Sequence, residues 1–421
     1  MYEYSVCEAG SIIDDQIKQE HVFGANHYER VNLVIQKSKG CWLHDSSGSK
    51  YLDCLAAYSA ANLGHHHPRV VNSLIAALSD DCGSVLSNVG YSSKLATFLK
   101  KVATFVPQLG PRFGNSGNKV LPKNGGVESV ETAIKAARFY GYKCKGIPDG
   151  KQEIIVFNNS FHGRTIAAIS FSTSPKYRQG FGPLIPGFVS VEYSNLDKVE
   201  QAITKNTCGI LVEPMQGEGG MIQPQEGFLK DLRSLCDHHD LFLIFDEIQV
   251  GFGRTGKKFC FQHENVIPDG LILGKALSGG LVPISVFVTN KNVMDLVFSV
   301  GSDGSTFGGY PLACVAGTTA IAVLEEESLI ERAQFQGERL KQKIISICEK
   351  SPHVREVRGQ GLFIGIEVVN KNAMAYCHEL LNHGIFINDS HGHTIRVSPP
   401  LTINDDEIEY LCHALELVLL K

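Results

Sequence analysis

The stretch Leu241-Phe-Leu-Ile-Phe-Asp-Glu-Ile-Gln249 decides the fold, because five consecutive apolar residues run directly into two carboxylates. A short, unbroken apolar run is typical of a strand that is buried on both faces of a parallel sheet. In open α/β sheets, ligands bind beyond the carboxyl ends of such strands. Asp246 and Glu247 are therefore placed where a ligand can be held. Taken alone, a helix cap or a surface ion pair explains them equally well.

Runs of the same kind recur on both sides of this stretch, and helical segments separate them. Apolar residues at Val127, Val130, Ile134 and Ala137 follow helical spacing, and residues 227–239 indicate another helix. Alternating strands and helices form the βαβ pattern, so the sequence predicts an α/β fold with a large, mostly parallel sheet. The other strands that we expect in this sheet cover residues 154–157, 210–212 and 271–273.

The two ends of the chain have a different character. Residues 31–35, 41–43 and 51–55 suggest β-hairpins, with a turn at 46–49, and Pro68 opens a helix. A long polar helix over roughly 327–350, further strand signals and a final helix indicate a smaller α+β domain. That final helix is expected to start with a capping box of Asn404 and Glu407. We expect three parts: an N-terminal segment joining the small domain (1–69), a large domain (70–320) and a C-terminal small domain (321–421).

Composition excludes several classes of protein. The 421 residues carry 39 Lys+Arg against 44 Asp+Glu, a formal charge of −5, which does not fit a polybasic nucleic-acid binder. Apolar runs of five residues are far shorter than the roughly 20 that a membrane span needs. The acidic first thirty residues resemble neither a signal nor a transit peptide. Twelve cysteines without a C-x-x-C pair indicate free thiols, so we expect a cytoplasmic protein. From the charge and the short apolar runs, we expect neither nucleic-acid nor membrane partners.

A second expected strand end places a lysine beside glycines, in Leu271-Ile-Leu-Gly-Lys275. A lysine in such a pocket can act as a nucleophile toward carbonyls, although alone it would more often be a surface lysine. Pyridoxal phosphate chemistry needs a Schiff-base lysine and an acid beside the pyridine nitrogen, which Lys275 and Asp246 can supply together. Asn124-Gly-Gly-Val127 leads into an expected helix, whose N-terminus offers backbone donors for a phosphate.

With these residues in view, the sequence resembles the class III aminotransferases of PLP fold type I, and within them most closely the ornithine aminotransferases. The resemblance runs from about Gly24 to the C-terminus. It implies a homodimer that uses pyridoxal 5'-phosphate to move the terminal amino group of L-ornithine to 2-oxoglutarate, giving glutamate semialdehyde and glutamate. The motifs that carry it are Ser160-Phe-His-Gly-Arg-Thr165, Glu213-Pro-Met-Gln-Gly-Glu218, Asp246-Glu-Ile-Gln249, Leu273-Gly-Lys-Ala-Leu-Ser-Gly-Gly280, Gly304-Ser-Thr306 and Arg396-Val-Ser-Pro-Pro400.

The resemblance implies a role for each cofactor-binding residue. Lys275 would form the Schiff base and move protons, and Asp246 would pair with the pyridine nitrogen. Gln249 would contact the phenolic oxygen of the ring, and Phe161 would stack on the ring face. The phosphate would be bound by backbone groups of Gly126 and Val127 and by Ser305 and Thr306, the last of these reaching the neighbouring subunit's site.

The resemblance also implies the substrate contacts. Arg396 would bind the α-carboxylate of glutamate, because a guanidinium meets a carboxylate with two hydrogen bonds. Glu218 would cover Arg396 while a terminal amine reacts, so that the pair acts as a switch; the alternative is a fixed structural salt bridge. Arg164 and Tyr28 would bind the far end of ornithine, and Tyr58 is typical of ornithine-specific members.

Some alternatives stay open at this point. The amine donor could instead be acetylornithine, lysine or 4-aminobutyrate, and an aminomutase or decarboxylase can share the fold. A catalytically silent binding protein is a third class, which intact Lys275, Asp246 and Gln249 argue against. Gly125 stands where a serine or threonine is common in the phosphate loop. No metal site is expected, because three consecutive residues such as His65–His67 cannot all face one ion.

Overall fold

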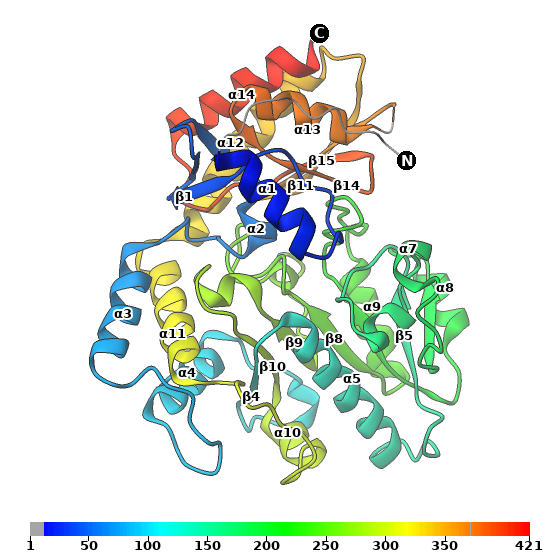
Figure 1. Cartoon of the computed structure of the whole chain (residues 1–421). Helices are drawn as coiled ribbons and strands as arrows, with labels where there is room; N and C mark the ends of the chain where they lie inside the picture. The colour runs from blue at the N-terminus through cyan, green and yellow to red at the C-terminus, as the bar shows by residue number, and fades with distance from the viewer. Residues whose placement is uncertain (1–11, 371) are drawn as a thin grey trace.

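The computed structural model of the chain describes residues 12–370 and 372–421 (Figure 1). A seven-stranded sheet with the order β4-β10-β9-β8-β7-β5-β6 forms the centre of the lower lobe in this view. Strand β10 is antiparallel to both of its neighbours, and the other six strands point the same way. The strands are β4 (Asn118–Lys123), β5 (Glu153–Phe157), β6 (Phe188–Val191), β7 (Thr207–Val212), β8 (Phe242–Asp246), β9 (Gly270–Leu273) and β10 (Ser285–Asn290).

Both faces of this sheet are buried in hydrophobic cores. In β8, Leu243 and Phe245 join one apolar cluster, whereas Phe242 and Ile244 join a second cluster. Successive side chains of a strand point to opposite faces, so this division explains why the run is continuously apolar. The expectation of a large, mostly parallel sheet is confirmed.

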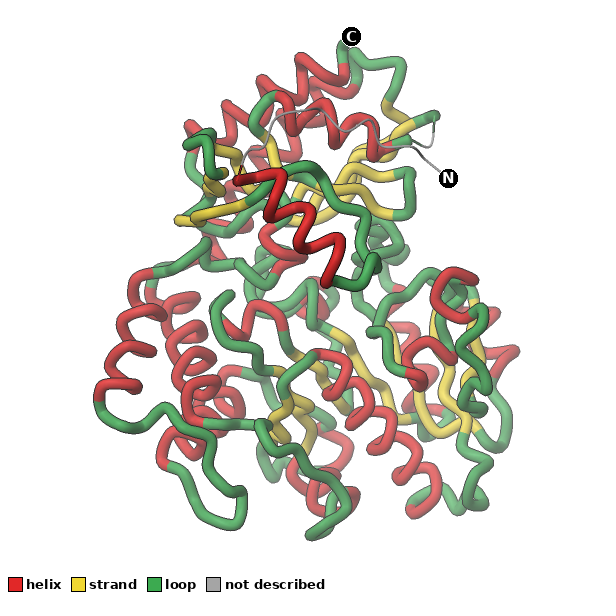
Figure 2. The backbone as a smooth tube through the Cα atoms, in the orientation of Figure 1, coloured by secondary structure: helices red, strands yellow, loops and turns green. Residues whose placement is uncertain are grey.

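Helices cover the sheet and connect its strands (Figure 2). Helix α5 packs on β7, β9 and β10, and α11 packs on α3, α4 and α12. The predicted apolar stripe of α5 is largely confirmed, because Val130, Ile134 and Ala137 are buried. The helices of this part are α3 (Pro68–Ser79), α4 (Ser93–Phe105), α5 (Gly126–Lys143), α6 (Ile166–Ser170), α7 (Pro175–Arg178), α8 (Leu196–Ala202), α9 (Phe228–His238), α10 (Lys291–Val297) and α11 (Pro311–Glu326), with 3-10 turns at η1 (Pro111–Phe113), η2 (Cys260–His263) and η3 (Lys275–Ser278).

The upper lobe of Figure 1 combines both ends of the chain. Two four-stranded sheets have the orders β1-β2-β3-β13 and β11-β12-β15-β14, so C-terminal β13 pairs with N-terminal β3. The elements are α1 (Ile12–Phe23), β1 (Ile35–Lys39), β2 (Trp42–Asp45), β3 (Lys50–Asp53), α2 (Ala56–Ser59), α12 (Leu329–Cys348), β11 (Val354–Gln360), β12 (Phe363–Val368), α13 (Ala373–Asn382), β13 (Ile385–Phe386), β14 (Asn388–Ser390), β15 (Thr394–Val397) and α14 (Asp405–Leu419).

Two sequence predictions for the chain ends have different outcomes. The capping box of α14 is confirmed, because Asn404 accepts the Glu407 N–H at 2.9 Å and Glu407 accepts the Asn404 N–H at 2.8 Å. The strand expected at 31–35 is wrong, because strand β1 begins only at Ile35. The chain turns before it, where Leu33 N–H donates to the Val31 carbonyl. Strand β1 is exposed and polar, so it carries no apolar alternation that the sequence could reveal.

The division into domains at residues 69 and 320 stays a prediction, and helix α11 runs through residue 320. Residues 1–11, on which the absence of a targeting peptide partly rests, lie outside the described residues. Within the described part, every helix is too short or too polar to cross a membrane.

Candidate active site

The carboxyl ends of the parallel strands bring the predicted site residues to one edge of the sheet. Asp246 is the last residue of β8, and Lys275 follows the end of β9 by two residues. The segment with Phe161 follows β5, and Glu213 follows β7 directly. Strand β4 leads into Asn124 and the start of α5. This convergence follows from the strand directions, because parallel neighbours end at the same edge.

Asp246 is held by two donors. Its Oδ2 lies 2.7 Å from His162 Nδ1, and its Oδ1 accepts the Ile248 N–H at 3.0 Å. The His162 side chain is completely buried. Burial opposes the charged form of His162, but the hydrogen bond and negative charge of Asp246 raise its pKa overall. The carboxylate is therefore fixed in orientation by a buried imidazole ring.

A second buried acid, Glu213, lies near this pair. It accepts the Phe161 N–H at 3.1 Å and the Gly217 N–H at 3.2 Å. Burial raises the pKa of Glu213 to about 7. Sequence reasoning did not assign roles to Glu213 or to the contact of His162 with Asp246. The only signal was their presence inside two of the motifs.

Lys275 occupies an unusual backbone position for a residue with a side chain. Its φ angle is +42°, in the left-handed region that favours glycine. Strain of this kind persists where the surrounding structure enforces it, often at functional sites. Burial lowers the pKa of Lys275 to about 8, so a substantial share of its amine is neutral slightly above neutral pH.

The N-terminus of α5 approaches the strand end that carries Asp246. A Cβ on Gly126 would lie 2.9 Å from Ile248 Cδ1, so a larger residue there would have to displace the end of the Ile248 side chain. Glu128 Oε2 accepts the N–H groups of Asn124 at 3.2 Å and Gly125 at 2.5 Å. The first N–H groups of a helix have no partner inside the helix. Those of Gly126 and Val127 are placed for an anion.

Gln249, three residues after Asp246, has a buried side chain that can donate a hydrogen bond. Its Nε2 has no hydrogen-bond partner among the described residues. Gly217 lies so close that a Cβ there would be 1.9 Å from Gln249 Oε1. Buried amide groups are nearly always paired, so this donor indicates a ligand atom at that place.

Arg396 and Glu218 meet as the sequence predicts. The Arg396 side chain is fully buried on β15, and its Nη2 lies 2.9 Å from Glu218 Oε1. This contact lacks hydrogen-bond alignment, and no guanidinium nitrogen of Arg396 has another partner in the described part of the chain. The charges attract each other, but the N–H groups of Arg396 remain available.

Tyr58 reaches this arginine from a left-handed turn. The four residues Ala56–Ser59 have φ angles of +46° to +73°, although none is glycine. Such a conformation costs roughly 1–2 kcal/mol per residue. Asp53 Oδ1 stabilises the turn by accepting the Leu55 and Ala56 N–H groups at 2.9 Å. The turn places the Tyr58 ring 5.1 Å from the Arg396 guanidinium carbon, and Asn388 Nδ2 donates to the Tyr58 hydroxyl at 3.0 Å.

Arg164 is held differently. Its guanidinium carbon lies 3.9 Å from the centre of the Tyr177 ring and 5.6 Å from that of Phe161. No ion pair or hydrogen bond of Arg164 with a described residue is present. Tyr28 is not brought to it: the Tyr28 side chain is 61% exposed, and its ring contacts His27.

Ser305 and Thr306 lie outside the cluster around Lys275. Ser305 Oγ accepts a hydrogen bond from Asn124 Nδ2 at 3.1 Å, whereas Thr306 is exposed. The three histidines His65–His67 turn toward different groups. His65 meets Asp53 at 2.7 Å, and His67 meets Glu327 at 3.2 Å.

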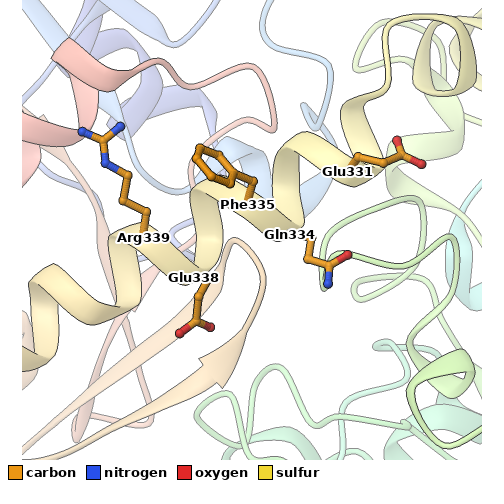
Figure 3. A pocket seen from close by; sticks show the side chains of 5 residues that line it. All are labelled: Glu331, Gln334, Phe335, Glu338 and Arg339. Atoms are coloured by element: carbon orange, nitrogen blue, oxygen red, sulfur yellow. The ribbon is translucent and has the colours of Figure 1, made fainter.

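Two cavities of the described structure lie in different places. One of about 210 Å³ opens beside Phe161, Tyr177 and Glu218. A larger one, of about 590 Å³, lies on the outer face of α12 (Figure 3) and includes no predicted site residue. Of these two cavities, the smaller one is lined by the predicted site residues Phe161 and Glu218.

Comparison with known proteins identifies the family. The sequence pattern described as Aminotransferase class-III matches residues 23–419. The chain belongs to the class III aminotransferases. These enzymes depend on pyridoxal phosphate, so the cofactor expected from the sequence is confirmed.

Curated class III relatives cover nearly the whole chain. The chain is 42% identical to the ornithine aminotransferase of Brevibacillus brevis over 96% of its length and 97% of that protein. It is 44% identical to ornithine aminotransferase 2 of Staphylococcus aureus, over 92% and 94%. The crystal structure of ornithine aminotransferase from Toxoplasma gondii ME49 superposes with a TM-score of 0.92 at 34% identity, covering 97% and 95% of the two chains.

The site residues of this class III aminotransferase fit pyridoxal phosphate. The free Nε2 of Gln249 can donate to the phenolic oxygen of the ring. The carboxylate of Asp246, fixed by His162, suits a protonated ring nitrogen. The N-terminus of α5 suits the phosphate. Each of these groups has the charge or donor that the cofactor requires.

Proposed function

We propose that this chain transfers the δ-amino group of L-ornithine to 2-oxoglutarate, producing glutamate semialdehyde and glutamate. The observation that supports this most is the buried Arg396 beside Glu218, with Nη2 and Oε1 2.9 Å apart. An enzyme that takes a terminal amine first and an α-amino acid second needs an arginine that can be covered and uncovered. The curated relatives named ornithine aminotransferase favour the same donor.

The bound cofactor supplies an aldehyde that receives the amino group and a ring that accepts electrons. Lys275, with its lowered pKa of about 8, moves protons between substrate carbon and nitrogen. Asp246 would face the ring nitrogen with its carboxyl group, which His162 holds in position at 2.7 Å. Phe161 would stack on one face of the ring.

Each of the two arginines, Arg164 and Arg396, binds the carboxylate of a different substrate. Arg164 binds the carboxylate of ornithine while Glu218 covers Arg396. When glutamate or 2-oxoglutarate enters, its α-carboxylate takes the place of Glu218 on the free N–H groups of Arg396. Tyr58 lies against Arg396 and limits the room around the α-carbon.

We also propose a homodimer in which Ser305 and Thr306 complete the phosphate site of the partner subunit. Asn88 Nδ2 donates to the Ser305 carbonyl at 3.0 Å, which joins the loop around Asn88 to the loop that carries Thr306. Large apolar side chains on these two loops are exposed, as expected for a surface that a second copy covers. They are Val85, Leu86, Val89, Tyr91, Val300 and Phe307.

A panel of amine donors with 2-oxoglutarate as acceptor tests the proposed donor. L-ornithine, N-acetylornithine, L-lysine and 4-aminobutyrate should be compared by kcat/KM. N-acetylornithine belongs in the panel because an acetylornithine aminotransferase from Elizabethkingia anophelis superposes with a TM-score of 0.86 at 35% identity. We expect ornithine to lead by at least about tenfold, or roughly 1.4 kcal/mol. A higher value for any other donor would overturn the assignment.

A further inference from the structure

Arg164 and Arg396 are held by different means, although both are proposed to bind carboxylates. Arg396 faces an acid, Glu218, which competes with any incoming carboxylate. Arg164 faces aromatic rings, with Tyr177 at 3.9 Å and Phe161 at 5.6 Å from its guanidinium carbon. An aromatic ring attracts the flat face of a guanidinium and leaves its N–H edge unused.

Tyr177 is well placed for this contact. It lies in the short helix α7, and its ring meets the Phe161 ring edge-to-face at 6.2 Å. Phe161, Arg164 and Tyr177 thus contact one another pairwise. Because Phe161 is fixed through its N–H group to buried Glu213, the set is anchored to the core at the end of β7.

Two of these residues, Phe161 and Tyr177, border the cavity of about 210 Å³. Tyr177 and Phe161 line one part of it, and Glu218 lines another. Roughly 10–15 Å³ of such space is enough for one water, so the cavity has room for several waters or for a small polar group. That is space for the polar end of an amino acid of the size of ornithine. The hydroxyl-bearing residues that also line it are Ser160, Ser172, Thr173 and Ser174.

We propose that Tyr177 is a specificity-determining residue, which holds the Arg164 guanidinium by its face so that its N–H edge stays available for the carboxylate of the amine donor. This inference rests on the proposed function. The inference goes beyond the proposed function because it names a further residue, outside the six motifs quoted above. This residue makes the site selective for donors with a carboxylate. Tyr177 acts through Arg164 and does not itself need to touch the substrate.

The substitution Tyr177→Leu tests the proposal in the holoenzyme. An exposed cation–π contact such as this one, with Arg164 exposed, is worth enough to weaken carboxylate binding by about 2- to 5-fold. We expect KM for ornithine to rise by that factor with kcat little changed. The glutamate half-reaction, which uses Arg396, should stay within about twofold. Tyr177→Phe keeps the ring and should retain wild-type KM, whereas Tyr142→Leu, at an exposed tyrosine of α5, serves as a matched control.

Two further measurements separate positioning from a general structural role. 1,4-Diaminobutane is ornithine without its carboxylate, so its turnover should not respond to Tyr177→Leu. In a double-mutant cycle, Tyr177→Leu should have no further effect on ornithine once Arg164 is replaced by alanine. Equal losses with ornithine and 1,4-diaminobutane, or additive effects of the two substitutions, would overturn the role of Tyr177. Failure of the proposed function appears differently, as absent ornithine turnover in the wild type.

Discussion

Replacing Glu218 by alanine should shift the preference of the enzyme from ornithine toward glutamate. In the present arrangement Glu218 occupies the space where an α-carboxylate would meet Arg396, with Nη2 and Oε1 2.9 Å apart. Removing the acid uncovers a fully buried guanidinium whose N–H groups have no other partner among the described residues. Glutamate should therefore bind and react better. Ornithine should in part bind unproductively, with its α-carboxylate on Arg396.

The size of the shift follows from the geometry. Two unit charges 2.9 Å apart interact by about 6 kcal/mol at an effective dielectric constant of 20, which is an upper bound. Hydrogen bonds to charged groups contribute about 1.5–3 kcal/mol net. The lower end applies, because the Glu218 side chain is 24% exposed and the contact lacks hydrogen-bond alignment. About 1.5 kcal/mol corresponds to a change of roughly tenfold in the ratio of the two half-reactions.

Single-turnover spectra with each donor alone measure this ratio directly, whereas steady-state constants mix the two halves. Glu226→Ala, at an exposed acid of the loop before α9, provides a matched loss of charge outside the site. Arg396→Ala should have the converse effect, crippling glutamate and 2-oxoglutarate more than ornithine. If Glu218→Ala slows both halves equally, the pair is a fixed structural salt bridge and the reasoning is refuted.

Three more substitutions test the cofactor site. Lys275→Ala should abolish turnover and the visible absorbance band while the protein keeps its melting temperature within a few degrees; undiminished transamination would exclude Lys275 as the catalytic amine. Asp246→Asn should lower kcat by at least about 100-fold with the cofactor still bound, because a neutral amide cannot hold the ring nitrogen in its charged form, and a loss below fivefold would reject this pairing. His162 has a raised pKa, so its imidazolium stabilises the fold fully below the unfolded pKa of about 6.5, and this stability is lost as pH rises through the folded value. The difference in melting temperature between wild type and His162→Phe should therefore narrow as pH rises above about 6.5, and a difference independent of pH would argue against the charged pair.

The strand ends of the large sheet could be predicted because a strand that is buried on both faces is a continuous run of apolar residues in the sequence. The run ending at Asp246 and the run ending before Lys275 are continuously apolar for that reason. Strand β1 could not be predicted, since an exposed strand needs no apolar residues. The left-handed turn at Ala56–Ser59 carries no glycine to announce it and depends on Asp53 and the surrounding packing.

The candidate site was only partly accessible from the sequence. The resemblance of the motifs to the family predicted that Arg396 and Glu218 form a pair, and the structure places them together. The contact of His162 with Asp246 joins residues 84 positions apart, so spacing alone could not reveal it. The role of Thr306 depends on a second chain, and no described contact links Tyr28 to Arg164.

The fate of the δ-nitrogen of ornithine tests the central claim most directly. L-Ornithine labelled with ¹⁵N at the δ position should be incubated with the holoenzyme and 2-oxoglutarate, and the glutamate formed should be examined by mass spectrometry. The proposed division of labour between Arg164 and Arg396 places the δ-amino group at the cofactor, so the label should appear in glutamate in proportion to turnover. Unlabelled glutamate formed from this substrate, which would mean transfer of the α-amino group, or no glutamate at all, would contradict the account.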